Sequence, residues 1–568
     1  MTTPAPGRRT FTLAALAAAG AGYFGAPGAL RAQAPVAGNA AAQAPPPEPW
    51  PLGNAEPPAS QFQPYPGGTG ALLERLMRER GAPAFARTPL VPEAWKGAVP
   101  ASPDDLVFLP AHRLAALLRT RRISSTRLTG LYLERLKRLN PTLNCLVTLL
   151  ETQALADAAK ADAEIAAGKY RGPLHGLPYG LKDLFAARGT STTWGVPEFR
   201  DRVIDEDAEV VVRLRDAGAV LIAKLSTGLF AQNDQWFGGR TNNPWNLAQG
   251  SSGSSAGPAA AVAAGCVAFA IGTETQGSIV SPAIRCGITA LRPTFGRVSR
   301  YGGMVLAWSQ DRVGPMCRTA EDCAMVFSVI HGADEKDPST VTTPFRFDRR
   351  IDLSRLRVGV DPDAPTALVS RLQALGITPR AIGPRPTVPG MASGGLNVEY
   401  AAAFDDYVQR KAQETGLDLS ALPSTPAPTP PSTAANPMAP ADWNPRFVNG
   451  RLVRGFEFLQ VQRRRHVLVA KWGEFMKDLD LFIGAPSADV AANAQTGHPC
   501  VVFPYAFDVP PARPAGARPA ADQTPPPVLG PQPVCATIVG ALYADDVILA
   551  VAHRFQQVTD FHARRPNL

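Results

Sequence analysis

The segment 249–300 constrains the fold of this chain more than any other stretch. It begins with the loop GSSGSSAG (250–257), continues as an Ala-rich apolar helix and a short apolar strand, and ends in a second loop, GTETQGSIVSP (272–282). A helix followed by a returning strand brings its two flanking loops to the same end of the packed unit. Ser254 and Ser278 are therefore expected to meet in space. A flexible Ser/Gly linker is the alternative, but linkers do not flank a tightly apolar helix and strand.

Helices alternate with short apolar strands along the sequence before this segment. A helix is predicted for LETQALADAAKADAEIAAG (150–168), ending at Gly168, and another begins with Ser124 or Ser125 as its N-cap. GLPYGLKDLF (176–185) predicts a buried strand, and DAEVVVRLRDAGAVLIAKLS (207–226) predicts a helix, a turn and a strand. This alternation is typical of an α/β fold.

Stretches rich in proline mark the limits of the patterned sequence. Residues 35–104 are rich in Pro, Ala and Gly, which favours extended, poorly packed backbone, and we interpret them as a linker and N-terminal extension. Residues 105–568 are then one large α/β domain. Two further Pro-rich stretches, at about 422–445 and 509–533, fall between patterned segments and are interpreted as surface insertions.

The first 34 residues resemble a twin-arginine export signal. Arg8 and Arg9 precede a short Ala-rich apolar run, and Ala32-Gln33-Ala34 is a small-x-small cleavage site. An amphipathic or disordered tail is the alternative. The order of the three features favours export, so the mature protein is expected in the periplasm or outside the cell.

Composition and spacing argue against several classes of protein. The net charge of +9 comes from scattered basic residues with few aromatics among them, which argues against a nucleic-acid partner. Seven cysteines in a chain of 568 residues, mostly in apolar surroundings, predict buried free thiols. No metal-ligand spacing occurs, so no metal or other cofactor is expected. No stretch reaches the roughly 20 apolar residues of a membrane span.

Ser278 needs a base if it is a nucleophile, and no histidine lies near it in the sequence. Lys182, flanked by Leu, Tyr, Gly and Phe, is a candidate because desolvation favours the neutral amine. An arbitrary lysine is more often a surface charge. A competing interpretation takes residues 253–257 as a G-x-S-x-G elbow with Ser255 as nucleophile, but such an elbow follows a buried strand and this one follows a polar loop.

The motifs GLPYGLKDLF, GSSGSSAG, GTETQGSIVSPAIRCG and LRPTFGRVSRYGG, in this order, resemble the consecutive signatures of the amidase signature family of serine hydrolases. The resemblance runs from about residue 105 to the C-terminus. It implies a single large domain with a mixed, twisted central sheet flanked by many helices. It also implies that Ser278 attacks a carbonyl and that Ser254, preceded by a cis peptide bond, relays the proton to neutral Lys182.

The resemblance further assigns the oxyanion hole and a substrate pocket. The backbone N–H groups of Thr275, Gln276, Gly277 and Ser278 would stabilise the oxyanion. Leu229 and Phe230 are candidate substrate contacts, with the protein core as the equally plausible place for them.

Four positions depart from the commonest family pattern: Glu274, Gln276 and Val280 stand where Asp, Gly and Arg are usual, and Ser252 replaces a glycine. The missing arginine is expected to leave the acidic residue without its ion-pair partner. Gln276 adds a side chain beside the oxyanion loop, which bears on substrate preference.

The predicted function is that of an exported amidase that hydrolyses a carboxylic amide, or an ester, through an acyl-serine. One alternative is the amidase subunit of a tRNA-dependent amidotransferase, and another is a catalytically silent binding protein on the same fold. The expected partner is a small-molecule amide, with a homodimer left open.

Overall fold

The computed structural model describes residues 62–568, except 392–394, 417, 420–444, 486–489 and 509–529. The predicted export signal therefore lies outside the described residues, as does most of both Pro-rich insertions. Pro445 already begins a helix and Gln532 already begins a strand, so regular structure resumes just inside the expected ends of the insertions.

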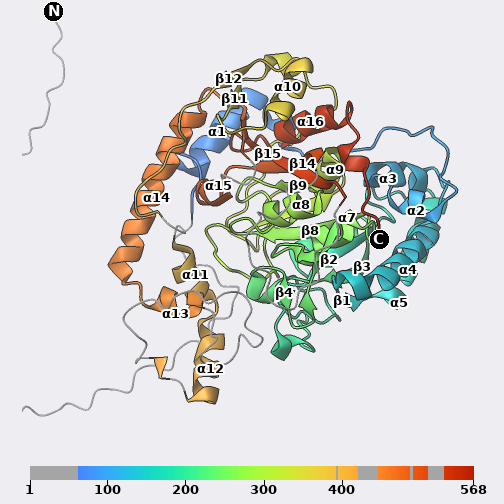
Figure 1. The fold of residues 1–568 in the computed structure, drawn as a ribbon, viewed down its shortest axis with the longest axis horizontal. Helices are drawn as coiled ribbons and strands as arrows, with labels where there is room; N and C mark the ends of the chain where they lie inside the picture. Colours follow the sequence, from blue (N-terminus) through green and yellow to red (C-terminus); the bar gives the residue numbers. More distant parts are fainter. Residues whose placement is uncertain (1–61, 392–394, 417, 420–444, 486–489, 509–529) are drawn as a thin grey trace, which may run out of the picture. The chain divides into compact units, whose positions relative to one another are not determined.

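An eleven-stranded mixed sheet organises the domain, as expected (Figure 1). The neighbours β2 and β8 run parallel, and β10, β9, β14 and β15 continue the sheet from β8 as antiparallel neighbours. In sheet order the strands are β1 (Leu146–Leu149), β3 (Val220–Leu225), β2 (Pro178–Lys182), β8 (Phe269–Glu274), β10 (Arg312–Cys317), β9 (Thr289–Arg292), β14 (Cys500–Asp508), β15 (Gln532–Gly540), β13 (Leu481–Gly484), β11 (Val358–Val360) and β12 (Pro379–Ala381). Two small sheets pair β4 (Gln235–Trp236) with β5 (Gly239–Arg240) and β6 (Asn242–Asn243) with β7 (Asn246–Gly250).

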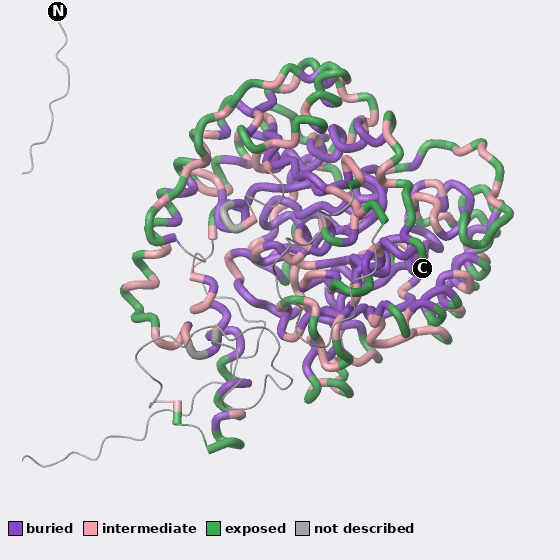
Figure 2. The backbone as a smooth tube through the Cα atoms, in the orientation of Figure 1, coloured by how far each residue is buried: buried purple, intermediate pink, exposed green. Residues whose placement is uncertain are grey.

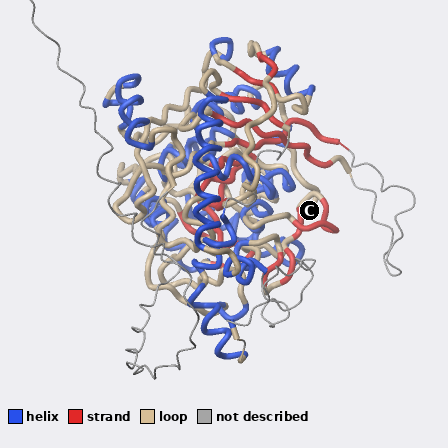
Figure 3. Tube along the Cα trace, turned by 90° about the vertical axis from the view of Figure 1, so that its left-hand side faces the viewer, coloured by secondary structure: helices blue, strands red, loops and turns tan. Residues whose placement is uncertain are grey.

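Helices pack around the sheet, and the strands run through the molecule between them (Figure 3). The helices are α1 (Gly68–Arg80), α2 (Pro103–Val107), α3 (Ala111–Arg119), α4 (Ser125–Leu143), α5 (Glu151–Ala166), α6 (Glu209–Asp216), α7 (Ala256–Ala263), α8 (Val280–Cys286), α9 (Ala320–Ile330), α10 (Thr366–Ala374), α11 (Leu396–Ala403), α12 (Asp405–Thr415), α13 (Pro445–Arg451), α14 (Gly455–Met476), α15 (Val490–Thr496) and α16 (Asp545–Gln556). None of the described helices is both long and apolar enough to cross a membrane.

The helices and strands predicted for the sequence before residue 249 are confirmed. Ser124 is the N-cap of α4, since its Oγ accepts a hydrogen bond from the Arg127 N–H at 3.1 Å. Gly168 follows the end of α5 with a φ of 77°, the left-handed conformation that suits glycine after a helix. All five residues of β2 are buried.

The N-terminal extension is better packed than its composition predicts. Helix α1 lies within the stretch expected to be extended, and its Leu72 and Leu76 are buried in a small cluster with Tyr543. Because these leucines are four residues apart, they share one face of the helix. The prolines on either side of this short pattern obscured it in the sequence.

The core follows the central strands, where the chain is buried almost continuously (Figure 2). All eight residues of α7 are buried, as are all seven cysteines, which are free. Helix α7 can be buried on every side because it consists mainly of alanine and glycine, with Val262 as its largest residue.

Candidate active site

Lys182 is the last residue of β2, and its neighbour β8 ends at Glu274. Because β2 and β8 are parallel, their carboxyl ends meet at the same edge of the sheet. The Lys182 side chain is fully buried there, with Nζ 2.8 Å from the Ser254 Oγ and 2.8 Å from the Thr273 Oγ1. Burial lowers the pKa of Lys182 well below its ordinary value, although the carboxylates of Asp311 and Glu274 act in the opposite direction. A neutral amine is therefore favoured beside Ser254.

The two loops predicted to meet do so. The Ser255 N–H donates to the Ser278 carbonyl oxygen at 3.1 Å, which joins the loop before α7 to the loop after β8. The Gly253–Ser254 peptide bond is cis, which confirms that prediction. Gly253 also lies close to a neighbouring loop, because a Cβ at this position would be 1.8 Å from the Asn233 carbonyl oxygen.

Ser255 is engaged in backbone contacts. It is fully buried, its Oγ donates to the Thr273 carbonyl oxygen at 3.1 Å, and the same Oγ accepts from the Thr273 N–H at 3.2 Å. These bonds attach the start of α7 to the end of β8. The geometry therefore favours a structural role for Ser255 over that of a nucleophile at an elbow.

Residues 275–278 form a tight turn between β8 and α8. Gly277 has a φ of 97°, which glycine adopts without strain. Ser278 is half-buried, whereas Lys182 and Ser254 are buried, so Ser278 is the most accessible of the three predicted catalytic residues. The N–H groups of Gly277 and Ser278 donate to no other group in the described part of the chain. They are free to bind an oxyanion.

The expectation that Glu274 lacks an ion-pair partner is wrong. Arg292, on β9, lies with Nη1 2.8 Å from the Glu274 Oε1, and both side chains are fully buried. The other carboxylate oxygen of Glu274 accepts from the N–H groups of Ile279 and Val280, each at 2.8 Å. Burial alone would raise the pKa of Glu274, but Arg292 and these N–H groups hold it below its ordinary value. The carboxylate thus anchors the chain directly after Ser278.

Asp311 holds the other side of the same turn. It directly precedes β10 and accepts from the Thr275 Oγ1 at 2.6 Å and from the N–H groups of Leu306 and Ala307. Burial raises the pKa of Asp311 to about 6, against the lowering effect of these bonds.

The side chain of Gln276 is fixed as well. Its Nε2 donates to the Gln310 Oε1 at 2.8 Å, so two neighbouring residues of one segment, Gln310 and Asp311, hold two neighbouring residues of the turn. Neither partner is predictable from the sequence, because strand order rather than spacing brings them to the turn.

Phe230 belongs to the core. It is 1% exposed, and its ring packs against those of Phe404, Tyr407 and Phe447 with centroid distances of 5.2–5.4 Å. Leu229 is half-buried and packs against the main hydrophobic core. Phe230 is therefore a core residue, which was the alternative to a substrate contact, and a substrate contact for Leu229 stays a prediction.

A second lysine is buried one strand away from Lys182 in different surroundings. Lys224, on β3, is fully buried, and its Nζ lies 2.9 Å from the Asp183 Oδ1. Its Nζ also donates to the Thr192 Oγ1 and to the Ser191 carbonyl oxygen, both at 3.0 Å. Lys224 is therefore paired with a carboxylate, whereas the polar partners of Lys182 are neutral oxygens.

Metal ligation finds no support in the described residues, which hold no cluster of three or more His, Cys, Asp or Glu side chains that could bind an ion. The sheet thus carries a buried lysine that contacts Ser254, in a loop hydrogen-bonded to Ser278.

Comparison with known proteins identifies the family. The family model named Amidase matches residues 127–374. A glutamyl-tRNA(Gln) amidotransferase subunit from Methylococcus capsulatus is 35% identical over 486 residues, covering 80% of this chain and 97% of the relative. The corresponding protein from Thiobacillus denitrificans is 33% identical, covering 80% and 98%. The solved peptide amidase from Stenotrophomonas maltophilia is 26% identical with a TM-score of 0.64, covering 81% and 98%. The chain belongs to the amidase signature family, and it is an enzyme that hydrolyses amides.

Proposed function

We propose that the protein hydrolyses a carboxylic amide C–N bond through an acyl-enzyme on Ser278, with Ser254 and Lys182 as the proton relay. The observation that carries this proposal is the contact of 2.8 Å between the buried Lys182 amine and the Ser254 hydroxyl, in a loop hydrogen-bonded to Ser278. Since the polar partners of the amine are neutral oxygens, it has no bonded carboxylate to keep it protonated.

In the proposed reaction, neutral Lys182 accepts the proton of the Ser254 hydroxyl while Ser254 accepts that of Ser278. The Ser278 Oγ attacks the amide carbonyl carbon, and the backbone N–H groups of residues 275–278 stabilise the oxygen as it becomes negative. The ammonium of Lys182 then returns its proton through Ser254 to the leaving nitrogen as the C–N bond breaks. Water repeats the sequence on the acyl-serine, releases the carboxylic acid and restores Ser278.

A covalent probe tests the assignment of the nucleophile. We expect a fluorophosphonate to label the wild-type protein and the Ser255→Ala variant, and to leave Ser278→Ala unlabelled. Mass spectrometry of the labelled peptide should place the adduct on Ser278. Labelling of Ser278→Ala at the wild-type rate would refute the assignment, and a folded wild-type protein that takes no label would favour the catalytically silent alternative.

A second candidate function is that of the amidase subunit of a tRNA-dependent amidotransferase, which the sequence relatives support more directly than they support a free-standing amidase. The relatives with 31–35% identity that cover about four fifths of this chain bear the name of a glutamyl-tRNA(Gln) amidotransferase subunit. Purified chain that hydrolyses small amides by itself supports the free-standing enzyme. Glutamine hydrolysis that appears only when the other amidotransferase subunits and glutamyl-tRNA(Gln) are added supports the second candidate.

We also propose that residues 1–34 direct export, on the order of Arg8-Arg9, apolar run and Ala32-Gln33-Ala34. The test compares the native chain with the Arg8→Lys/Arg9→Lys double variant in cell fractions, with N-terminal sequencing of the processed protein. Processed protein in the periplasm that disappears in the variant supports export. Equal cytoplasmic retention of both would contradict it, and would remove the main argument against the amidotransferase function.

A further inference from the structure

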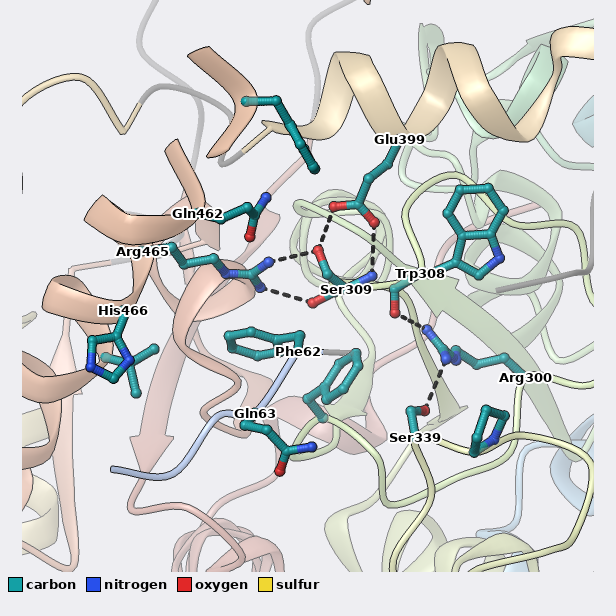
Figure 4. A pocket seen from close by; sticks show the side chains of 14 residues that line it. Phe62, Gln63, Arg300, Trp308, Ser309, Ser339, Glu399, Gln462, Arg465 and His466 are labelled. Atoms are coloured by element: carbon teal, nitrogen blue, oxygen red, sulfur yellow. Dashed lines mark hydrogen bonds between the residues drawn. The ribbon is translucent and has the colours of Figure 1, made fainter. Parts of the chain in front are cut away.

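A cavity of 330 Å³ lies apart from the Lys182–Ser254 contact, against helix α14 (Figure 4). Its walls come from the first described residues of the chain, from α14 and α11, and from loops near residues 295–309 and 338–339. Figure 4 shows Gln462, Arg465 and His466 on the α14 side and Arg300 and Ser339 across the cavity.

Aromatic rings and neutral amides dominate the ligand-binding chemistry of this cavity. Phe62 and Phe295 meet edge to face with centroids 5.2 Å apart, and Phe458 and Trp308 add two further rings to the lining. The primary amide of Gln462 offers donors and an acceptor, and Gln63, whose Oε1 already accepts from the N–H and the hydroxyl of Thr69, offers its NH2 group. Rings favour a flat apolar group, while side-chain amides suit a partner that also donates and accepts.

Arg300 and Arg465, two charged residues of the lining, already make hydrogen bonds within the protein. Arg300 binds both carboxylate oxygens of Asp337 at 2.8 and 2.9 Å and also donates to Ser339 and to the Trp308 carbonyl oxygen. Arg465 is 1% exposed and donates to the Gln495 carbonyl oxygen and to Ser309.

Glu399, the carboxylate of the cavity, accepts from the N–H and the hydroxyl of the same Ser309. These charged groups already have hydrogen-bond partners within the protein, so a charged ligand would lose its hydration and would have to compete with those bonds. The cavity favours an uncharged ligand.

We propose that this cavity binds an uncharged monocyclic aryl amide group. Its volume lies at the lower end of the range of small-molecule sites, which suits a single ring with a short polar substituent. The ring would pack against the aromatic side chains that line the cavity, and the amide would bond the Gln462 side chain and the Gln63 NH2 group.

The cavity is connected to the turn that carries Ser278. Ser309, which lines the cavity, is followed directly by Gln310 and Asp311, whose side chains hold Gln276 and Thr275. A ligand that displaces Ser309 therefore acts on the two residues that position the proposed oxyanion loop. The aryl amide group has two possible sources. It is either the far end of the substrate, in which case the inference rests on the proposed function, or a separate molecule that alters the turnover of a substrate.

Binding is tested without turnover, by titrating benzamide into the Ser278→Ala protein and measuring its Kd calorimetrically. Gln462→Trp fills the cavity from α14, and Gln460→Trp is the matched control, since Gln460 is exposed on the same helix and lines no part of the cavity. We expect Gln462→Trp to raise the Kd at least tenfold and Gln460→Trp to change it less than twofold. Equal affinity in the two tryptophan variants, or no binding to the parent protein, overturns the proposal.

A second variant keeps the test valid if the Gln462→Trp protein fails to fold. Gln462→Leu preserves the size of the side chain and removes its amide, so we expect about a fivefold higher Kd for benzamide. Because these measurements need no catalysis, a protein that hydrolyses nothing can still bind benzamide, and the failure of the two proposals can be told apart.

Kinetics on the enzyme with Ser278 intact then distinguish the two sources of the ring. If it belongs to the substrate, KM passes through a minimum as methylenes are added between a phenyl ring and the scissile amide, and Gln462→Trp removes that minimum. If it belongs to a separate molecule, added benzamide changes kcat or KM for acetamide in the parent enzyme and not in Gln462→Trp. Either response supports the site. A parent enzyme and a Gln462→Trp variant that behave identically in both arms contradict it.

Discussion

Replacing Lys182 with methionine should separate catalysis from stability, because the buried amine is useful only as a base. Methionine keeps most of the volume of the side chain and removes the proton acceptor. We expect kcat/KM to fall by about 10³-fold or more, as when other members of a catalytic triad are removed.

The effect on stability should depend on pH. Burial lowers the pKa of Lys182, so between the depressed folded value and the ordinary value near 10.5 the unfolded chain carries one more proton than the folded protein. The wild-type protein therefore gains about 1.4 kcal/mol of unfolding free energy for each pH unit of increase in that window, and Lys182→Met lacks this gain. The loss of a partner for the Ser254 and Thr273 hydroxyls adds a destabilisation of about 1–3 kcal/mol that does not vary with pH.

Urea unfolding at pH 7, 8 and 9 measures the difference directly. Relative to the wild type, Lys182→Met should become more stable as the pH falls from 9 to 7. Lys224→Met is the matched control: it removes an equally buried lysine but leaves the Asp183 carboxylate unpaired, which should cost about 3–5 kcal/mol. Parallel pH curves for Lys182→Met and the wild type would show that Lys182 is protonated in the folded protein, and would refute its role as a base.

Three further substitutions test the residues that hold the turn. Glu274→Gln leaves Arg292 buried without a counter-ion and should lower the unfolding free energy by about 3–5 kcal/mol and kcat by about 10²-fold; unchanged urea unfolding would show that the pair is dispensable. Asp311 has a pKa of about 6 when folded and about 3.8 when unfolded, so the folded state holds its proton to higher pH. The wild type should lose about 3 kcal/mol as pH rises from 3.8 to 6, and Asp311→Asn should not; matching denaturation curves over this range would contradict the argument. Gln276→Gly removes the side chain bonded to Gln310 and should lower KM for bulky amides about tenfold while leaving acetamide unaffected; an equal change for both substrates would exclude a steric role.

The sequence predicted the parts of the site that depend on local order. The helix and strand between Ser254 and Ser278 predicted that their loops meet, and the apolar surroundings of Lys182 made it a candidate base, a role that the resemblance to the amidase signature family then assigned. Arg292 and Asp311 escaped prediction because their roles depend on strand order. Strand β10 pairs Arg312 with Glu274, which brings Asp311 beside Thr275, and β9 follows next in the sheet. No spacing in the sequence reveals that arrangement.

The N-terminal extension shows a different limit. Composition described the average of residues 35–104, but two leucines at helical spacing were enough to fix α1 against Tyr543. Phe62 likewise contributes a wall of the cavity against α14. A few apolar side chains in a Pro-rich stretch can thus determine how it packs, and a compositional average cannot detect them.

The complete burial of α7 has an evolutionary consequence. Each of its eight residues is enclosed, so a larger side chain would push a neighbouring element: a Cβ at Gly257, for example, would lie 2.4 Å from the Ser226 backbone nitrogen. Mutational drift should therefore be nearly as restricted in this helix as at the reacting residues themselves. In a deep mutational scan, α7 would resemble part of the catalytic machinery although its side chains are simply buried, so intolerance to substitution would not by itself identify a chemical role here.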